Sequence, residues 1–187
     1  MNLMTAIQVV VFVMGTIFIA FVSRRSLLSL EYHGFYRFFV FEFTLVLILI
    51  NFPHWFSEPF SIHQIISWIF LFYSLLLIIQ SVYFIRNFGG SKMNRDNSAN
   101  LEFENTTNLI REGIYRYIRH PMYGSLLFLA IGTMLKRVSV ITASLSIAVL
   151  IFVILTAKKE EKENIQFFGP DYEAYIKKTK MFVPLIF

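Results

Sequence analysis

Residues 62–85, IHQIISWIFLFYSLLLIIQSVYFI, run for 24 positions without an Asp, Glu, Lys or Arg. A helix needs about 20 consecutive apolar residues to cross the hydrocarbon core of a bilayer. Three other segments have a comparable length and character: residues 4–22, 36–52 and 138–157. Together these segments predict four full-length membrane-spanning helices.

A fifth apolar segment, residues 121–135, is shorter than the others. As a helix it would rise only about 22 Å. The tight polar turn at Lys136-Arg137 nevertheless leads it directly into segment 138–157, so we count it as a span. The expected fold is all-α: a polytopic membrane bundle of about five transmembrane helices. An odd number of spans places the two termini on opposite sides of the bilayer.

The composition excludes an ordinary soluble domain. Hydrophobic residues make up 56% of the 187-residue chain, its mean hydropathy is +0.60, and it contains 22 Phe. The net charge of +5 comes from basic patches between apolar runs, a pattern that suits an anionic membrane surface rather than nucleic acid. The absence of cysteine excludes disulfides, thiolate metal sites and a cysteine nucleophile.

The distribution of cations predicts the orientation, because cytoplasmic loops of membrane proteins are rich in Lys and Arg. Fifteen of the seventeen Lys and Arg residues fall on one side if the N-terminus is outside and the C-terminus is cytoplasmic. Lys136 and Arg137 alone fall on the other side. We therefore expect an integral, multi-pass protein with this orientation, in the inner membrane of a prokaryotic cell.

The expected cytoplasmic polar regions are a short loop at residues 23–35, a long loop at residues 86–120 and a tail at residues 158–187. Residues 89–100, GGSKMNRDNSAN, predict a flexible connection, whereas residues 101–120 are richer in Tyr, Ile and Arg and are expected to pack. In the tail, Gly169-Pro170 predicts a helix stop. Residues 171–176 then predict a short amphipathic helix on the cytoplasmic side, with Tyr172, Tyr175 and Ile176 on one face.

The densest polar segment is residues 113–124, GIYRYIRHPMYG. Pro121 suits the first helical position and makes His120 the expected N-cap. The free N–H groups at this helix start, beside Arg116 and Arg119, favour a carboxylate or phosphate. The alternative is that the two arginines only extend to lipid head groups.

A second polar segment, KKEEKE at residues 158–163, follows the last span. Its Glu160 is expected to hold an ammonium or sulfonium group, and the alternative is a solvated run of charges. Within the bilayer, Glu42 is a candidate for function or for an ion pair with Arg37 or Arg86. The four histidines fall on different sides of the membrane by this topology, so no metal site is expected.

The segments 107–123 and 160–175 contain an ordered pattern that spans a transmembrane hairpin. Its members are Thr107-Asn108-Leu109-Ile110, Gly113, Tyr115, Arg119-His120-Pro121, Tyr123, Glu160-Glu161, Phe168-Gly169, Tyr172 and Tyr175. In this pattern the chain resembles the membrane methyltransferases typified by isoprenylcysteine carboxyl methyltransferase, with the phospholipid methyltransferases as relatives. The resemblance implies an S-adenosylmethionine-dependent methyltransferase that acts on a lipophilic substrate, isoprenylcysteine-carboxylate-like or lipid-like, at the cytoplasmic side.

The resemblance also implies the roles of individual residues. Cofactor-binding residues would be Thr107, Asn108, Leu109, Ile110, Tyr115, His120, Pro121, Met122, Tyr123 and Glu160. Substrate-binding residues would be Arg119 and Thr156, which stands where isoprenylcysteine enzymes tend to carry an Arg. No catalytic residue is assigned. The catalytic region would be residues 101–187, preceded by the N-terminal helices and the flexible loop in residues 1–100.

Other functions stay open at this stage. One alternative is a sterol- or polyprenoid-type membrane reductase that uses NADPH, and another is a non-catalytic membrane bundle. Within the methyltransferase interpretation, the expected partners are the lipid bilayer and a lipophilic or lipidated substrate, with no nucleic acid and no metal. The acceptor atom, whether O, N or S, is also undetermined.

Overall fold

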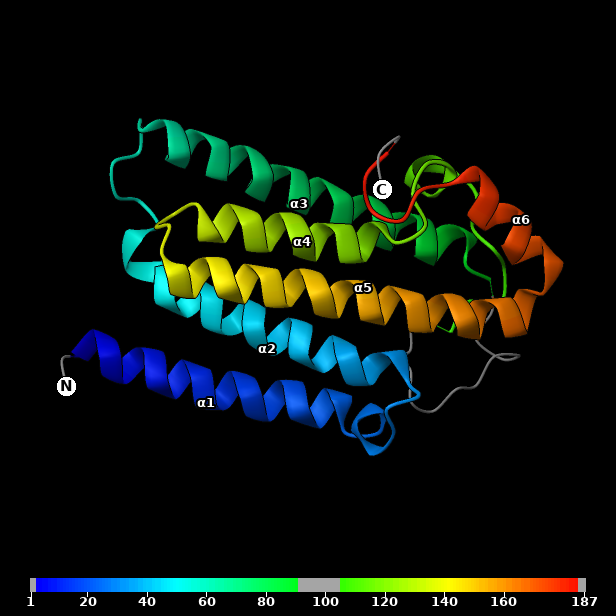
Figure 1. Cartoon of the computed structure of the whole chain (residues 1–187), viewed down its shortest axis with the longest axis horizontal. Coiled ribbons are helices and arrows are strands. Elements are labelled where there is room, and N and C mark those ends of the chain that lie inside the picture. The colour runs from blue at the N-terminus through cyan, green and yellow to red at the C-terminus, as the bar shows by residue number, and fades with distance from the viewer. Residues whose placement is uncertain (1–2, 91–104, 185–187) are drawn as a thin grey trace.

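The computed structural model describes residues 3–90 and 105–184 as a helical bundle (Figure 1). Within these ranges the only β-structure is an isolated bridge between Ile118 and Lys180. The helices are α1 Leu3–Ser23, α2 His33–Asn51, α3 Ile62–Phe88, α4 Pro121–Met134, α5 Val140–Phe168 and α6 Pro170–Lys178, with short 3-10 turns η1 Ser26–Leu28, η2 Phe52–His54 and η5 Gly113–Arg116. The predicted all-α membrane bundle is confirmed.

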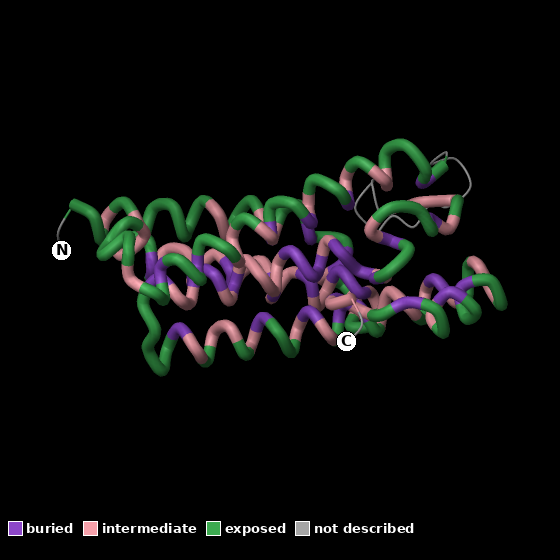
Figure 2. The backbone as a smooth tube through the Cα atoms, turned by 90° about the horizontal axis from the view of Figure 1, so that it is seen from above, coloured by how far each residue is buried: buried purple, intermediate pink, exposed green. Residues whose placement is uncertain are grey.

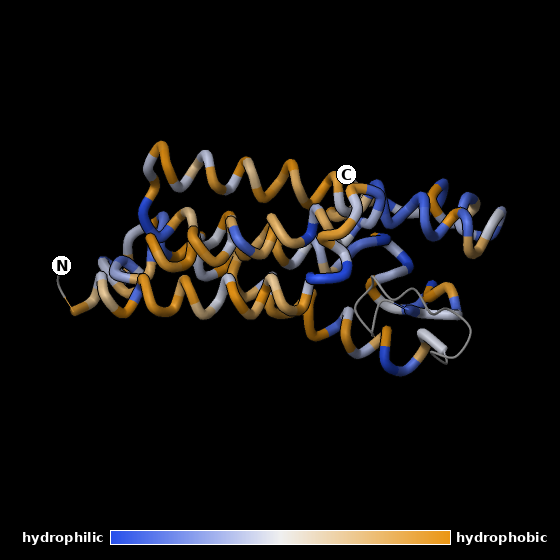
Figure 3. The backbone as a smooth tube through the Cα atoms, turned by 90° about the horizontal axis from the view of Figure 1, so that it is seen from below, coloured by the Kyte–Doolittle hydropathy of each residue, from blue (hydrophilic) through white to orange (hydrophobic). Residues whose placement is uncertain are grey.

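Four helices, α1, α2, α3 and α5, are long and apolar enough to cross a membrane. They overlap the four segments expected from the sequence, although α5 begins two residues later than expected and extends to Phe168. Apolar residues follow the bundle along most of its length, whereas polar residues gather at its two ends (Figure 3). Exposed positions dominate α1 (Figure 2). Many of its large apolar residues, such as Leu3, Met14 and Phe18, are more than 60% exposed. Such a surface requires lipid around it, so the chain is an integral membrane protein.

The fifth predicted span is α4, an apolar helix of 14 residues. It lies beside α3 and α5 inside the bundle (Figure 1). The start of α1 and helix α6 lie at opposite ends of the bundle, in the arrangement that an odd number of crossings requires. The count of five crossings remains a prediction, because α4 is shorter than a full span.

Small residues allow α4 to approach α3 closely. A Cβ atom on Gly132 would lie 2.9 Å from the Leu71 side chain and 3.1 Å from the Ser67 carbonyl oxygen. The hydroxyl of Ser67 donates to the Gly132 carbonyl at 2.6 Å, and the hydroxyl of Ser74 donates to the Ser125 carbonyl at 2.7 Å. Close backbone contact and interhelical hydrogen bonds are the usual means of helix association in lipid.

Helix α2 packs on α5 on one side and on α1 on the other. The Phe39 and Phe152 rings lie 5.0 Å apart between α2 and α5. Glu42 accepts a hydrogen bond from the Thr16 hydroxyl of α1 at 2.9 Å. The predicted pairing of Glu42 with an arginine is therefore wrong in the described part of the chain, because the carboxylate faces α1 rather than Arg37 or Arg86.

Helix α5 continues beyond the start of α4 and ends as predicted at Gly169, whose φ of 59° is accessible to glycine. Helix α6 then turns back over the bundle, and its Tyr172 and Tyr175 are buried. The chain after α6 pairs with the segment before α4: Arg119 N–H donates to the Lys180 carbonyl at 2.8 Å, and His120 N–H donates to the Met181 carbonyl at 3.1 Å.

The connection predicted at residues 89–100 lies outside the described residues, except for Gly89 and Gly90. The segment that follows packs as expected. The backbone N–H groups of Thr107 and Asn108 both donate to the Gly89 carbonyl, at 2.9 and 3.2 Å, and Ile110 is buried.

We expect Gly132→Val to destabilise the bundle by about 1–3 kcal/mol, because the new side chain would collide with Leu71 and with the backbone of α3. Thermal unfolding of the purified protein in detergent, followed by circular dichroism, measures the effect. Ser144→Val on an exposed position of α5 is the control and should change the midpoint little. Equal midpoints for the two variants would contradict the close α3–α4 packing.

Candidate active site

The candidate site begins at the start of α4. Pro121 occupies the first helical turn, and His120 holds the N-cap position with φ −123° and ψ 60°, outside the helical region. The His120 carbonyl accepts the first helical hydrogen bond from Gly124 N–H at 2.9 Å. The predicted N-cap position is confirmed, but the His120 side chain does not cap the helix and instead points toward α5.

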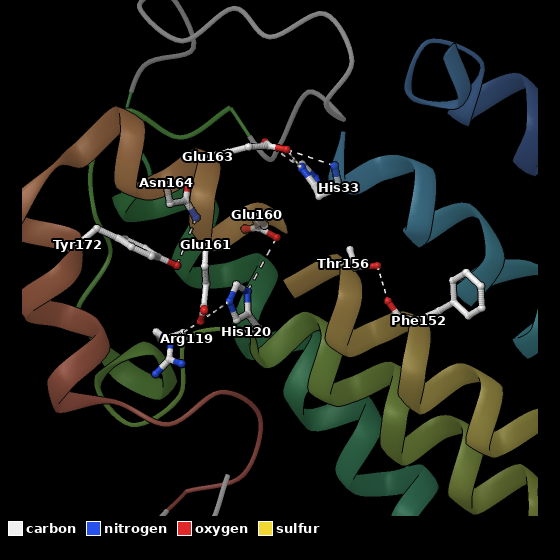
Figure 4. A network of polar contacts seen from close by, with 10 residues as sticks. All are labelled: His33, Arg119, His120, Phe152, Thr156, Glu160, Glu161, Glu163, Asn164 and Tyr172. Carbon is white, nitrogen blue, oxygen red and sulfur yellow. Dashed lines mark hydrogen bonds and ion pairs between the residues drawn. The ribbon is translucent and has the colours of Figure 1, made fainter. Parts of the chain in front are cut away.

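Two adjacent carboxylates of α5 flank the imidazole of His120 (Figure 4). Its Nε2 lies 3.3 Å from Glu161 Oε1, and its Nδ1 lies 3.8 Å from Glu160 Oε2. The ring is 4% exposed and stacks on Tyr123 at 5.5 Å. These contacts on three sides hold the imidazole in one orientation, which is what a precise binding site requires.

Glu161 also binds Arg119. The Arg119 Nε donates to Glu161 Oε1 at 2.6 Å, and Nη1 donates to the carbonyls of Ile176 and Thr179 at the end of α6. Both side chains are largely buried. Arg119 therefore joins the segment before α4 to α5 and to the C-terminal end of α6, where carbonyl groups favour a cation.

The arginine contacts modify the anion site expected from the sequence. The charge of Arg119 is balanced by Glu161, so it is not an unpaired cation waiting for a ligand. Arg116 is exposed and does not line the cavity described below. Both arginines lie just before the start of α4 in the sequence. The structure pairs Arg119 with Glu161 of α5 and leaves Arg116 exposed.

A cavity opens beside His120, and its lining comes from distant parts of the chain. The volume of this cavity is about 90 Å³. The lining residues are Ile85, Thr106, Asn108, Leu109, Ile110, Tyr115, Arg119, His120, Pro121, Met122, Tyr123, Glu160, Asn164, Phe168, Tyr172 and Tyr175.

All the predicted cofactor-binding residues except Thr107 line this cavity. Its neighbour Thr106 lines the cavity instead. Of the two predicted substrate-binding residues, Arg119 lines the cavity and Thr156 does not. Thr156 is fully buried one turn before Glu160, and its hydroxyl donates to the Phe152 carbonyl at 2.7 Å (Figure 4). Its donor is thus satisfied within its own helix, which leaves it no part in this cavity.

Six lining residues were not predicted: Ile85, Thr106, Asn164, Phe168, Tyr172 and Tyr175. Asn164 follows Glu160 by four positions on α5, so helical periodicity alone predicts that both face the same way. The aromatic residues belong to the ordered pattern in the sequence, but their inward direction follows from the turn at Gly169. No feature of the sequence predicted that Ile85, which belongs to α3, would line the cavity.

A glycine shapes one wall of the cavity. Gly113 has φ 56°, and a Cβ atom there would lie 2.0 Å from the ring of Phe84. Only glycine combines this backbone conformation with such a close approach. The resulting turn, η5, brings the Tyr115 side chain into the cavity lining.

The buried tyrosines remain neutral. Burial, and secondly the negative charge of Glu160, raise the pKa of Tyr115 and of Tyr172 well above the usual value. Burial likewise raises the pKa of Tyr175, whose hydroxyl donates to the Tyr115 carbonyl at 2.6 Å. At neutral pH these hydroxyls are therefore hydrogen-bonding groups rather than bases. Aromatic rings together with the Glu160 carboxylate form surroundings that favour a cation.

A second polar link lies on the same stretch of α5. The Glu163 carboxylate accepts from the His33 backbone N–H at 3.2 Å and lies 2.9 Å from His33 Nδ1 (Figure 4). This contact joins the start of α2 to α5 outside the cavity. Across residues 3–90 and 105–184, no group of three or more His, Cys, Asp or Glu is arranged to hold a metal ion.

We expect Glu161→Ala to lower the free energy of unfolding by about 1.5–3 kcal/mol, because it leaves the buried Arg119 without its carboxylate. Chemical denaturation in detergent measures the loss. Glu173→Ala, which removes an exposed carboxylate from α6, serves as the control and should cost far less. A similar loss in both variants would show that the Arg119–Glu161 contact does not stabilise this end of the bundle.

Comparison with known proteins identifies relatives. The phospholipid methyltransferase family model matches residues 62–170, more than half of the chain. The protein-S-isoprenylcysteine O-methyltransferase of Schizosaccharomyces pombe is 39% identical over 79 residues, which are 42% of this chain and 34% of the relative. A probable protein-S-isoprenylcysteine O-methyltransferase of Oryza sativa subsp. indica is 32% identical over 87 residues, 46% of each chain.

The corresponding enzyme of Saccharomyces cerevisiae is 34% identical over 83 residues, 42% of this chain and 33% of the relative. The matches thus span between a third and a half of the length of these relatives. No solved structure gave a match. The matched region includes all of α3, the His120 segment and the carboxylates of α5, and the chain belongs to the phospholipid methyltransferase family.

Proposed function

We propose that this protein is an S-adenosylmethionine-dependent methyltransferase that acts on a lipophilic substrate. The observation that carries the proposal is the convergence of His120, Tyr115 and Glu160 on one cavity at the end of an apolar helix bundle. Family membership supports the same activity. Its relatives named above are isoprenylcysteine O-methyltransferases, which supports a lipidated acceptor as one substrate class.

The cavity suits the two charged ends of the proposed cofactor. Glu160 faces the cavity and is 24% exposed, so it is available to an ammonium or sulfonium group. The rings of Tyr115, Tyr123 and Tyr172 provide faces that attract such a cation. The start of α4 offers N–H groups to a carboxylate. When bound, S-adenosylmethionine supplies an activated methyl group on its sulfonium.

The protein's own contribution is positioning and exclusion of water. His120 is held by Glu161 and Tyr123 on one wall, while α6 covers the cavity with Tyr172 and Tyr175. Fixed walls of this kind align two reactants and remove competing water, which together account for much of the rate enhancement in a direct transfer. No side chain is required to become a covalent intermediate. We propose residues 101–187 as the catalytic region, because all the described lining residues except Ile85 fall within this range.

The site restricts the chemical class of the methyl acceptor less than that of the methyl donor. Thr156 occupies the position expected to meet a substrate carboxylate, yet it is fully buried and bonded to its own helix. Among the described residues that line the cavity, Arg119 is the sole Lys or Arg, and it is paired with Glu161. These features favour an acceptor recognised by its apolar part over one held by its carboxylate, and they leave a lipid amine, a thiol and a hydroxyl as candidates.

The direct experiment is to incubate the purified protein with radiolabelled S-adenosylmethionine and a total membrane lipid extract, and then to identify the labelled fraction. Transfer of the label to a lipid supports the proposal and identifies the acceptor class.

Isothermal titration of the purified protein with S-adenosylhomocysteine, and in parallel with NADPH, distinguishes a methyltransferase from a membrane reductase. Binding of NADPH alone would reject the methyltransferase.

We expect Glu160→Gln to weaken S-adenosylhomocysteine binding by about tenfold, because it removes the carboxylate that faces the cavity. Isothermal titration in detergent measures the dissociation constant. The matched control is Glu163→Gln, which makes the same change three positions along α5, where the carboxylate contacts His33 instead of the cavity. Equal weakening in both variants would mean that the effect comes from α5 as a whole.

We also propose that the N-terminus lies outside and that α6 lies on the cytoplasmic side of a prokaryotic inner membrane. The chain contains no cysteine, so single cysteines can be introduced directly. In intact cells, a membrane-impermeant maleimide should label Arg137→Cys but label Lys177→Cys only after permeabilisation. Labelling of Lys177→Cys in intact cells would reverse the orientation.

A further inference from the structure

The turn between α4 and α5 lies at the end of the bundle opposite α6 (Figure 1). A second polar cavity opens at this turn. Its space is about 460 Å³, and its walls come from η2, the start of α3 and the turn between α4 and α5. The polar side chains used below are His54, Glu58, Gln64, Lys136 and Arg137. None of them belongs to the cofactor cavity, and the proposed methyl transfer uses none of them.

Lys136 is the central group of this cavity. It is 2% exposed, and its Nζ donates to Gln64 Oε1 at 3.0 Å. Gln64, itself 1% exposed, is fixed by donating to the carbonyls of His54 and Lys136 at 3.1 and 3.2 Å. The buried amide of Gln64 thus fixes the position of the Lys136 ammonium, whereas the ammonium of a surface lysine would be free to move.

Aromatic rings surround the same ammonium. Its Nζ lies 3.6 Å from the centroid of Trp68 and 5.5 Å from that of Trp55. Ring faces stabilise a cation but do not neutralise it. Tryptophan is enriched at the depth of lipid head groups, so these two residues also indicate that the cavity lies at the membrane interface.

The second cation, Arg137, is exposed at the same cavity. Its Nη1 lies 2.9 Å from His54 Nε2, a contact in which the guanidinium donates. A guanidinium has five N–H donors in a planar fork, so this contact leaves most of them available. The fork geometry matches the oxygens of phosphate and carboxylate groups.

Neither cation is paired with an acid in the described part of the chain. Glu58, the single carboxylate that lines the cavity, is exposed and forms no ion pair with them. Removing a cation from water without a partner is costly. In agreement, burial lowers the pKa of Lys136 below its usual value. Gln64 and the two tryptophan rings offset part of this cost, and a bound anion would supply the opposite charge that the described part of the bundle lacks.

We propose that this cavity is a binding site for a phosphate group, with Lys136 and Arg137 as the residues that hold it. The interfacial tryptophans favour the phosphate of a lipid head group as the source, and by the orientation proposed above this lipid would belong to the outer leaflet. The site is separate from the cofactor cavity, so it stands or falls independently of the proposed methyl transfer.

The protein contains a built-in reporter for this site. Trp55 and Trp68 are the two tryptophans of the whole chain, and both lie beside Lys136. We expect their fluorescence to change saturably when the full-length protein, in dodecyl maltoside, is titrated with dihexanoylphosphatidic acid. Parallel titrations use inorganic phosphate and the uncharged dihexanoylglycerol.

We expect Arg137→Gln to raise the midpoint of this titration about tenfold, as for the loss of a charged hydrogen bond. Lys136→Gln should abolish the change. Because Lys136 is buried and its variant is at risk of misfolding, the exposed Arg137 provides the decisive variant. Lys177→Gln removes the same charge from exposed α6 at the other end of the bundle and should behave as the unmodified protein.

The fluorescence titrations distinguish the two possible sources of the phosphate group. Saturation by dihexanoylphosphatidic acid alone supports a lipid head group, and saturation by inorganic phosphate at similar concentrations supports a free phosphate group. Three results would overturn the proposal: no saturable change with either phosphate probe, an equal change with dihexanoylglycerol, or an unaltered midpoint in Arg137→Gln.

Discussion

The difference in length between α4 and its neighbours controls where polar groups can gather in this protein. Helix α4 has 14 residues, whereas α3 has 27 and α5 has 29, so α4 begins part of the way along the bundle. The volume that α4 does not fill is taken by the segment before it and by α6 (Figure 1). The backbone N–H groups of Arg119 and His120 donate to carbonyls of the C-terminal chain, so these segments satisfy one another's buried polar groups.

Glu161 makes this polar region rigid. It contacts Arg119 and His120 at once, and Arg119 in turn holds the last carbonyls of α6. The contacts of Arg119 with Glu161 and with Ile176 span 42 and 57 positions of the sequence, so this ion pair joins the segment before α4 to α5 and to α6. Because Glu161 is committed to these contacts, its neighbour Glu160 is the carboxylate left facing the cavity. Glu161 thus orders the site, and Glu160 is available to a ligand.

The two ends of the bundle have opposite electrostatic character. At the α6 end, tyrosines and Glu160 line the cavity, and the arginine there is balanced. At the other end, Lys136 and Arg137 have no acidic partner within the described residues. The first environment favours a cation and the second favours an anion. A membrane protein can maintain both because about 30 Å of hydrocarbon separates them and prevents the charges from pairing.

The sequence by itself determined the features that depend on neighbouring residues. Hydropathy predicted the four long helices, Pro121 predicted the start of α4, and Gly169 predicted the end of α5, since each is a local effect of solvation or backbone geometry. Only the tertiary structure decided which side chains meet across helices. Thr156 bonds to its own helix, Glu42 contacts Thr16, and Lys136 has no acidic partner within residues 3–90 and 105–184. Helix rotation and packing, which no local pattern encodes, set those directions.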